Sequence, residues 1–240
     1  QKTMRVAQQL YEGVDVKGSG TVGMITYLRT DSTRISDEAD AAARAYIAGN
    51  YGEEYVSSSV QEKKTGKKIQ DAHEAIRPTD ITRTPFMMKE SLTRDQFRLY
   101  QLIWKRFAAS RMANAQYVTT SVKIDAAGYR FHVSASKRKF DGFMAVYVQE
   151  EEEKGEGNLL VKEISEDTQL NFQAFDEKQH FTQPPAHYTE AALVKTLEEL
   201  GIGRPSTYAP TITTIINRRY VAKVHKNLYL TELGEVVNNI

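Results

Sequence analysis

Residues 93–107 read TRDQFRLYQLIWKRF, and this stretch predicts the clearest helix of the chain. Thr93 is followed three residues later by Gln96, which is the spacing of a capping box at a helix N-terminus. Apolar side chains then recur every three or four residues. They are Phe97, Tyr100, Ile103, Trp104 and Phe107. This period places them on one helix face, so we expect them in a hydrophobic core.

Local signals on either side of this helix predict further elements. A second helix is expected to begin at Ser36 and to stop at Asn50 and Gly52. From Tyr117 onward apolar and polar residues alternate on both sides of a turn at 126–128, which predicts a β-hairpin. The alternating residues are Val118, Val122, Ile124, Phe131, Val133 and Ala135.

Two more strands are predicted, over residues 142–148 and 159–161. They flank the acidic run 150–153, which we interpret as a solvated loop because like charges repel each other. Together with the hairpin, these segments predict a small antiparallel sheet from about residue 116 to residue 182.

Pro184 and Pro185 indicate the next boundary, because proline disrupts both strands and helix interiors. Thr189 is expected to cap a helix that runs to Leu200 and ends at Gly201. A second helix is predicted to begin near Ser206 or Thr207, with Pro210 tolerated in its first turn. A β-like stretch follows at 228–230, so the segment predicts a helix-turn-helix or winged arrangement.

The predicted fold class is therefore a multi-domain α+β protein. We expect a mainly helical domain over residues 1–115, a β-rich domain over 116–183 and a helix-turn-helix-like segment over 184–240. Residues 14–21 are treated as a linker within the first domain.

Composition limits the possible function classes. The 240 residues include 32 basic and 31 acidic side chains, so no global positive field indicates a nucleic-acid partner. Positive charge is local: residues 204–228 contain three Arg and two Lys without Asp or Glu. The absence of cysteine excludes disulfides and thiolate metal sites. No apolar run is long enough to span a membrane, so we expect a soluble, cytoplasmic protein.

The first candidate site lies in residues 23–34, GMITYLRTDSTR. In an extended segment Tyr27, Arg29 and Asp31 would share one face. A phenol is a poor nucleophile at neutral pH, and the Arg29 guanidinium could assist it because a guanidinium matches phosphate oxygens in a bidentate manner. These residues alone also fit a buried tyrosine beside an Arg–Asp ion pair.

The second candidate site is HEAIRPT, residues 73–79, which follows a stretch rich in lysine. On a helical turn His73 and Arg77 would face the same side, and together they suit a phosphate. A structural role for His73 is the alternative. The remaining histidines show no metal-ligand spacing with His73, so no metal site is predicted in the chain.

The third candidate site is GIGRPSTY, residues 201–208. Arg204, Ser206 and Thr207 stand at a predicted helix N-terminus, where free N–H groups and the helix dipole favour phosphate. Capping by Ser206 or Thr207 without any ligand is the alternative. The segment is not a P-loop, because the lysine of that motif is missing.

Taken in order, ITYLRTDS (25–32), HEAIRP (73–78) and GIGRPSTYA (201–209) resemble bacterial DNA topoisomerase I, a type IA topoisomerase. The similarity extends to residues 7–13 and 188–195. The resemblance implies that Tyr27 attacks a phosphodiester in single-stranded DNA and forms a 5′-phosphotyrosine bond, without ATP. It also implies that Arg29 steadies the scissile phosphate, that His73 forms a hydrogen bond there and that Asp31 orients these groups.

The resemblance further implies which residues contact DNA. Arg204, Ser206 and Thr207 match backbone-contact positions, and Gln8, Thr26 and Arg77 are further candidates. The implied partners are single-stranded and negatively supercoiled DNA, with relaxation of the latter by strand passage and religation. We expect a monomer that does not bind membranes and works at the bacterial nucleoid.

Family members carry an acidic Mg²⁺-binding domain, called Toprim, before this region. Mg²⁺ is therefore the implied cofactor, with its ligands outside these 240 residues. We expect the chain to be a piece that lacks this domain and a C-terminal region. Such a piece would bind single-stranded DNA but cleave it poorly.

Three alternatives are considered. Tyrosine recombinases also combine Arg, His and Tyr at phosphodiesters, but their nucleophile follows the other two in sequence, whereas Tyr27 precedes His73. A DNA-binding module without activity is a non-enzymatic alternative. Within the family, topoisomerase III and reverse gyrase remain open.

Overall fold

The computed structural model describes residues 2–30, 32–58, 73–148 and 167–240. They combine α-helices with small antiparallel sheets, as the sequence predicts. The chain forms two compact units, an N-terminal unit (Lys2–Gln169) and a C-terminal unit (Leu170–Ile240). The finer domain boundaries at 115/116 and 183/184 stay predictions. Within the described ranges, no helix is both long enough and apolar enough to cross a membrane.

The core of the N-terminal unit is built around α4, Arg94–Ser110. The predicted capping box is confirmed: Thr93 Oγ1 accepts the Gln96 N–H at 3.4 Å and Gln96 Oε1 accepts the Thr93 N–H at 3.0 Å. The predicted apolar face is also confirmed. Tyr100, Trp104 and Phe107 are buried, while Phe97 and Ile103 are partly buried against the same core.

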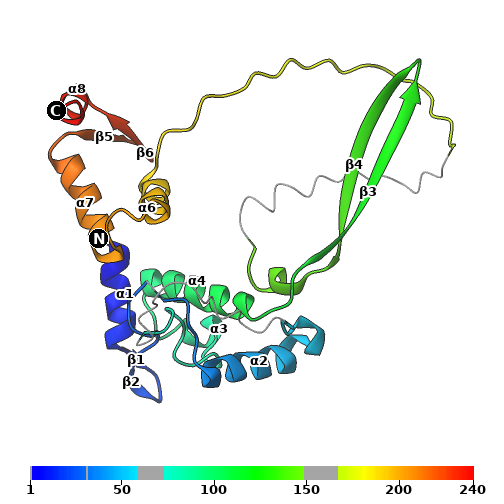
Figure 1. Cartoon of the computed structure of the whole chain (residues 1–240). Coiled ribbons are helices and arrows are strands. Elements are labelled where there is room, and N and C mark those ends of the chain that lie inside the picture. The colour runs from blue at the N-terminus through cyan, green and yellow to red at the C-terminus, as the bar shows by residue number, and fades with distance from the viewer. Residues whose placement is uncertain (1, 31, 59–72, 149–166) are drawn as a thin grey trace. The chain divides into compact units, whose positions relative to one another are not determined.

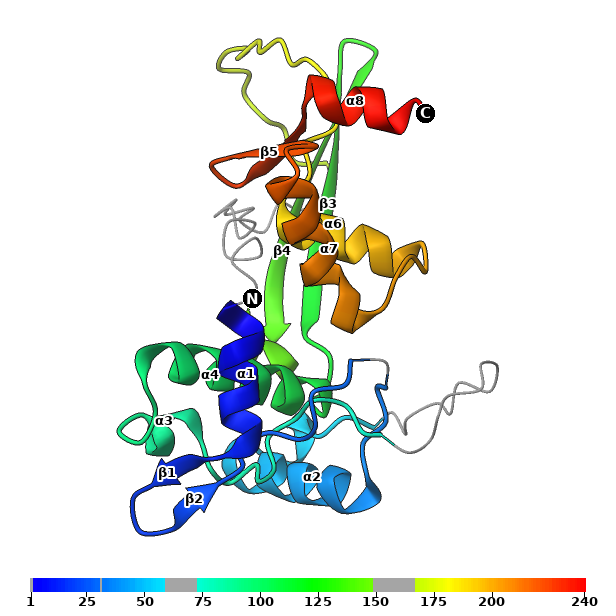
Figure 2. The same ribbon diagram turned by 90° about the vertical axis from the view of Figure 1, so that its left-hand side faces the viewer.

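Helices α1 (Lys2–Glu12) and α2 (Asp37–Tyr51) complete this core (Figures 1 and 2). Ser36 caps α2 and Gly52 ends it, as predicted, and the short helix η1 (Glu53–Tyr55) follows. An ion-pair network links α2 to the end of α4. Asp40 accepts hydrogen bonds from Arg44 at 2.6 Å and from Arg111 at 2.9 Å.

Residues 73–84 form no helix before the short α3, Pro85–Met88. The prediction of a helical turn that aligns His73 with Arg77 is therefore wrong. Two core side chains of α4 hold this irregular segment: Tyr100 Oη donates to the Arg83 carbonyl at 2.6 Å, and Trp104 Nε1 donates to the Ile81 carbonyl at 2.9 Å. Side-chain hydrogen bonds thus replace the helical ones, since buried backbone groups need partners.

The segment treated as a linker is a small hairpin. Strands β1 (Val14–Val16) and β2 (Gly20–Val22) pair antiparallel across a tight turn. Gly18 and Gly20 adopt φ values of 84° and 70°, a conformation that glycine allows at little cost. A strand of three residues is too short for an alternation of apolar and polar side chains to be recognised in the sequence.

The predicted large hairpin is confirmed as β3 (Gln116–Ala126) and β4 (Tyr129–Phe140), the long ribbon in Figure 1. Ala127 and Gly128, with φ values of 48° and 83°, form its two-residue turn. Directly opposed pairs share a face. Val122 with Val133 and Ile124 with Phe131 therefore give this ribbon one apolar face.

The rest of the predicted sheet needs correction. Residues 142–145 form the short helix η2 (Gly142–Ala145) and not a strand. The cause is Gly142, which has a φ of 51° and lies where a Cβ would collide with the Ala113 carbonyl oxygen. Residues 167–182 contain no strand, so the described part of this sheet is two-stranded. The strand predicted at 159–161 and the acidic loop lie outside the described residues.

The C-terminal unit has the predicted winged order of elements. Thr189 caps α6 (Glu190–Glu199), and Gly201, with a φ of 68°, ends that helix. Then follow α7, two strands and a last helix, seen together in Figure 2. These elements are α7 (Pro205–Asn217), β5 (Val221–Val224), β6 (Asn227–Leu230) and α8 (Glu232–Asn238).

One boundary in this unit differs from the prediction. Helix α7 begins at Pro205, before Ser206 and Thr207, because a proline is favoured at the first helical position and Arg204 is extended before it. Pro210 consequently lies in the second turn and not in the first.

The Asp40 network predicts a pH-dependent stability. Burial would raise the pKa of Asp40, but the hydrogen bonds and charges of Arg44 and Arg111 outweigh it and hold the pKa below its ordinary value. Asp40→Asn should lower the free energy of unfolding at pH 7 by about 1 kcal/mol, since solvent screens this partly exposed pair. Because the folded-state pKa is depressed, the difference should be complete above about pH 4 and should shrink as the pH falls from there through the lower folded-state pKa.

Urea unfolding of both proteins at pH 7 and pH 3 measures this difference. Asp125→Asn is the matched control, because its pair with Arg130 is exposed on the ribbon and should contribute nothing measurable. A cost of Asp40→Asn that is equal at both pH values would contradict the prediction.

Candidate active site

An antiparallel contact between two irregular segments forms the base of the site. Ile25 and Pro78 form a β-bridge. The Thr26 N–H donates to the Arg77 carbonyl at 2.9 Å, and the Thr79 N–H donates to the Met24 carbonyl at 3.1 Å. We call this contact between residues 23–27 and 75–79 the backbone clasp. It joins the first two candidate motifs of the sequence.

The side chain of Thr26 reinforces the clasp. Its hydroxyl donates to the Ala75 carbonyl at 2.7 Å and accepts the Arg77 N–H at 3.0 Å. Met24 and Ile25, just before it, are 0% and 1% exposed and anchor this segment in the core. The predicted DNA contact of Thr26 would have to share a hydroxyl that the backbone already uses.

Ser32 fixes the backbone of His73 from the other side. Its hydroxyl is buried and donates to the His73 carbonyl at 2.7 Å, while accepting the Arg34 N–H at 3.2 Å. The Ala75 N–H in turn donates to the Arg34 carbonyl at 2.7 Å. Sequence reasoning missed Ser32, and the only signal was the density of hydroxyl side chains in residues 30–33.

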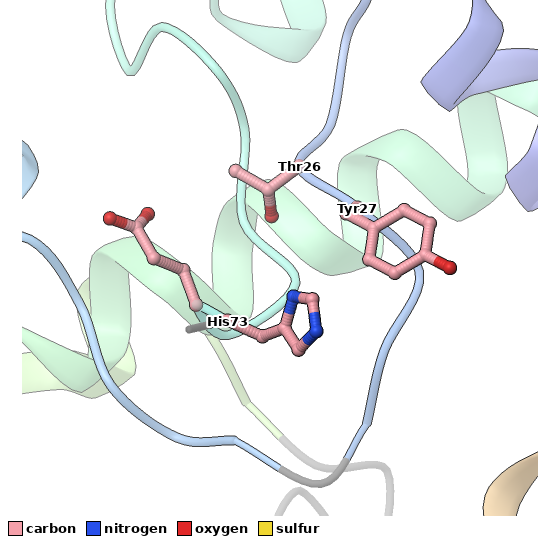
Figure 3. A pocket seen from close by; sticks show the side chains of 4 residues that line it. Thr26, Tyr27 and His73 are labelled. Atoms are coloured by element: carbon pink, nitrogen blue, oxygen red, sulfur yellow. The ribbon is translucent and has the colours of Figure 1, made fainter. Parts of the chain in front are cut away.

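The clasp places Tyr27 beside His73. Their ring centroids are 5.6 Å apart with the planes inclined by 37°. In the view of Figure 3, the Tyr27 hydroxyl points outward, away from the imidazole. Thr26, Tyr27, His73 and Glu74 line an open pocket at this point. Tyr27 is 54% exposed, which argues against a buried tyrosine and leaves its oxygen accessible to a ligand.

After Tyr27 the first motif makes a turn. The Arg29 N–H donates to the Tyr27 carbonyl at 2.8 Å and closes a three-residue turn around Leu28. The segment is therefore not regularly extended, and strict alternation does not put Tyr27 and Arg29 on one face. Asp31 lies outside the described residues.

Arg77 is engaged within its own motif. Its guanidinium donates to Glu74 at 2.7 and 3.0 Å and to the Pro78 carbonyl at 3.0 Å, and its side chain is 14% exposed. A DNA contact by Arg77 would have to replace one of these partners. Glu74, which sequence reasoning missed as an Arg77 partner, also lies 4.0 Å from Arg34. The three-residue spacing of Glu74 and Arg77 was the available signal.

Among the residues that the structure describes, the donor set around Tyr27 does not fit a Mg²⁺ ion. Glu74 is the carboxylate that lines the pocket, and its charge is compensated by Arg77. In the parts of the chain that the structure describes, no group of three or more His, Asp or Glu side chains could hold a metal ion.

The third motif lies in the C-terminal unit. The Arg204 N–H donates to Thr207 Oγ1 at 2.9 Å, and the same hydroxyl donates to the Arg204 carbonyl at 2.9 Å. Thr207 thus caps α7, as the ligand-free alternative proposed, while Arg204 and Ser206 are exposed at this helix end. In the N-terminal unit, Gln8 is exposed and donates to Glu12 at 2.7 Å.

Comparison with known proteins gives a match over the whole stretch that contains the three motifs. The family model for DNA topoisomerase matches residues 1–240. The chain therefore belongs to the bacterial DNA topoisomerase family, of type IA, and the resemblance drawn from the three motifs is confirmed. Membership in this family excludes the alternative that the chain is a tyrosine recombinase.

Among solved structures, the chain is similar to full-length topoisomerase I from Thermotoga maritima. The two share 40% sequence identity with a TM-score of 0.75, over 99% of this chain and 38% of the Thermotoga chain. The chain thus spans well under half the length of that relative.

The clasp predicts that the stability of the chain depends on the Thr26 hydroxyl. Thr26→Val keeps the shape of the side chain but leaves the Ala75 carbonyl and the Arg77 N–H without the hydroxyl. We expect a loss of about 1–3 kcal/mol in the free energy of unfolding, whereas Thr26→Ser should stay close to the unchanged protein. Denaturant unfolding of the three proteins is the measurement. Equal stability of the Val and Ser variants would contradict a role for the hydroxyl in the clasp.

Proposed function

We propose that this chain supplies the nucleophile of an ATP-independent type IA DNA topoisomerase, and that Tyr27 is that nucleophile. The observation that carries the proposal is the position of Tyr27: half-exposed, in ring contact with His73, on a segment fixed by the backbone clasp. A rigid support beneath an accessible side chain is what a nucleophile requires, since misplacement of a reacting atom is costly.

The proposed reaction exchanges one phosphodiester for another. The Tyr27 oxygen attacks the phosphorus of a single DNA strand, a P–O(Tyr27) bond forms and the P–O3′ bond breaks. The phenol loses its proton and the departing 3′-oxygen gains one, which leaves a 5′-phosphotyrosine and a free 3′-hydroxyl. Because the bond energy is retained, religation needs no ATP. Passage of the other strand before religation relaxes negatively supercoiled DNA.

We assign roles to the residues near Tyr27 from the chemistry of their side chains. Arg29 holds the scissile phosphate, because a guanidinium binds two phosphate oxygens at once and compensates developing charge. His73 forms a hydrogen bond to the same phosphate, and Ser32 keeps the His73 backbone in place for that contact. Asp31 is proposed to orient the surrounding groups.

The C-terminal unit is proposed to bind the DNA backbone. Arg204 and Ser206 are exposed at the N-terminal turn of α7, where helix N–H groups favour phosphate, and Thr207 stabilises that turn. Gln8 is a further candidate contact on α1. For Thr26 and Arg77 we propose that any effect on DNA binding arises mainly through the clasp, because their polar groups already have partners.

Mg²⁺ is proposed to act from the acidic domain that family members carry in addition to this region. It would supply positive charge near the phosphate when bound. The 240 residues alone are proposed to bind single-stranded DNA and to cleave it weakly at most.

Covalent trapping tests the assignment of Tyr27. The chain is mixed with the Mg²⁺-binding domain of a family member and with single-stranded DNA labelled at its 3′ end, then denatured. A labelled protein band is expected with Tyr27 and none with Tyr27→Phe, while Tyr129→Phe on the ribbon should react normally. An adduct that persists in Tyr27→Phe would contradict the assignment. DNA binding without any adduct would support the alternative of a DNA-binding module.

A salt titration tests the proposed backbone contact of Arg204. Arg204→Ala should weaken single-stranded DNA binding and reduce the slope of log affinity against log salt by about one, because one phosphate contact is lost. Arg130→Ala is the control, since its charge is already compensated by Asp125. An unchanged slope in Arg204→Ala would exclude a phosphate contact by this residue.

A further inference from the structure

Neighbouring aromatic rings limit the orientation of the Tyr27 side chain. Its side chain is 54% exposed and follows an irregular segment, so exposure alone would allow several rotamers. Two ring contacts restrict it. One is with His73, and the other is with Tyr11, whose ring centroid lies 5.5 Å away with the planes inclined by 66°. Tyr11 belongs to none of the three predicted sites.

Tyr11 is held firmly at the end of α1. Its neighbour Leu10 is completely buried, and the Leu10 carbonyl accepts the Met24 N–H at 2.7 Å. At Gly23 the chain passes so close that a Cβ would lie 3.0 Å from the Tyr11 carbonyl oxygen. The approach to Tyr27 is therefore fastened directly to the turn of α1 that carries Tyr11.

Helix α1 is itself tied to the core helix α4. Lys2 forms an ion pair with Asp95 at 2.6 Å, and Gln96 donates to Gln9 at 3.3 Å. These contacts hold the backbone of Tyr11 in place beside Tyr27, with Tyr11 37% exposed and Tyr27 54% exposed. An edge-to-face contact between aromatic rings favours one relative orientation beyond the area that it buries.

We propose that Tyr11 is a positioning residue for the cleavage reaction: its ring holds the Tyr27 ring in the orientation from which the phenol oxygen attacks the phosphate. The proposal rests on the proposed function of Tyr27. Tyr11 itself takes no part in bond making, so its ring matters and its hydroxyl does not. Pre-set orientation accelerates a reaction because the freedom of the reacting group is lost before the transition state.

The test compares Tyr11→Phe, which keeps the ring, with Tyr11→Leu and Tyr11→Met, which cover the same surface without a ring. The first readout needs no activity. Tyrosine-labelled NMR spectra of the full chain, with the Tyr27 signal assigned from Tyr27→Phe, report its ring-current shift and its Hα–Hβ couplings. The second readout is the single-turnover rate of adduct formation with the Mg²⁺-binding domain added, together with the affinity for single-stranded DNA.

We expect the Leu and Met variants to shift the Tyr27 signal and to average its couplings, while Tyr11→Phe keeps them. Adduct formation should slow roughly three- to tenfold in Leu and Met, which corresponds to about 0.7–1.4 kcal/mol, with unchanged DNA affinity. Tyr11→Phe should react within about twofold of the unchanged chain. Tyr129→Leu on the ribbon controls for the loss of an exposed tyrosine ring.

Two results would overturn the proposal: unchanged Tyr27 Hα–Hβ couplings in Leu and Met, or a rate loss in Tyr11→Phe equal to theirs, which would point to the hydroxyl. Thermal unfolding identifies any variant that loses its fold. If either Tyr11→Leu or Tyr11→Met unfolds, the other of the two ring-free variants tests the proposal. If the unchanged chain forms no adduct, the proposed function fails, whereas the NMR comparison still reports on the ring contact.

Discussion

The backbone clasp between residues 23–27 and 75–79 is the constraint on which the rest of the site depends. Tyr27 and His73 are distant in sequence, and neither segment is part of a helix or a named strand. The bridge of Ile25 with Pro78 and the two hydrogen bonds beside it fix their separation. Thr26 adds its hydroxyl to the same contact, so the residue before the proposed nucleophile Tyr27 closes the clasp that supports it.

Irregular segments gain their rigidity here from side chains. Helical hydrogen bonds are absent over residues 73–84, and buried backbone groups without partners would be costly. Ser32 supplies one of those partners from the segment before α2, and Tyr100 and Trp104 supply two more from α4. In the described part of the chain, no buried side-chain nitrogen or oxygen lacks a hydrogen-bond partner. An exposed tyrosine on a well-supported backbone follows from this arrangement, which suits the covalent role proposed for Tyr27.

Sequence reasoning succeeded where the determining interactions are local. The capping residues Ser36, Thr93 and Thr189 each begin a helix, and the alternation around the turn at 126–128 produces the ribbon. Local patterns failed where tertiary contacts decide. Residues 142–148 have strand-like composition, yet the close approach of Gly142 to Ala113 turns the chain into η2.

At the site, too, local patterns were recognised in the sequence and tertiary contacts were not. Motif order identified the family and singled out Tyr27 and His73, which the structure brings together. The helical spacing assumed for Arg77 was misleading because Glu74 binds its guanidinium within an irregular turn. Tyr11 and Ser32 could not be recognised in advance, since a ring contact and a hydrogen bond to a distant carbonyl leave no periodic signal in the sequence.

Hydrogen exchange of individual amides in the free chain tests most directly whether the clasp exists before DNA binds. The account predicts that the N–H groups of Thr26 and Thr79 exchange as slowly as those in the middle of α4, because both donate across the clasp. Exchange of these two amides at the rate of unprotected amides, with α4 still protected, would contradict it.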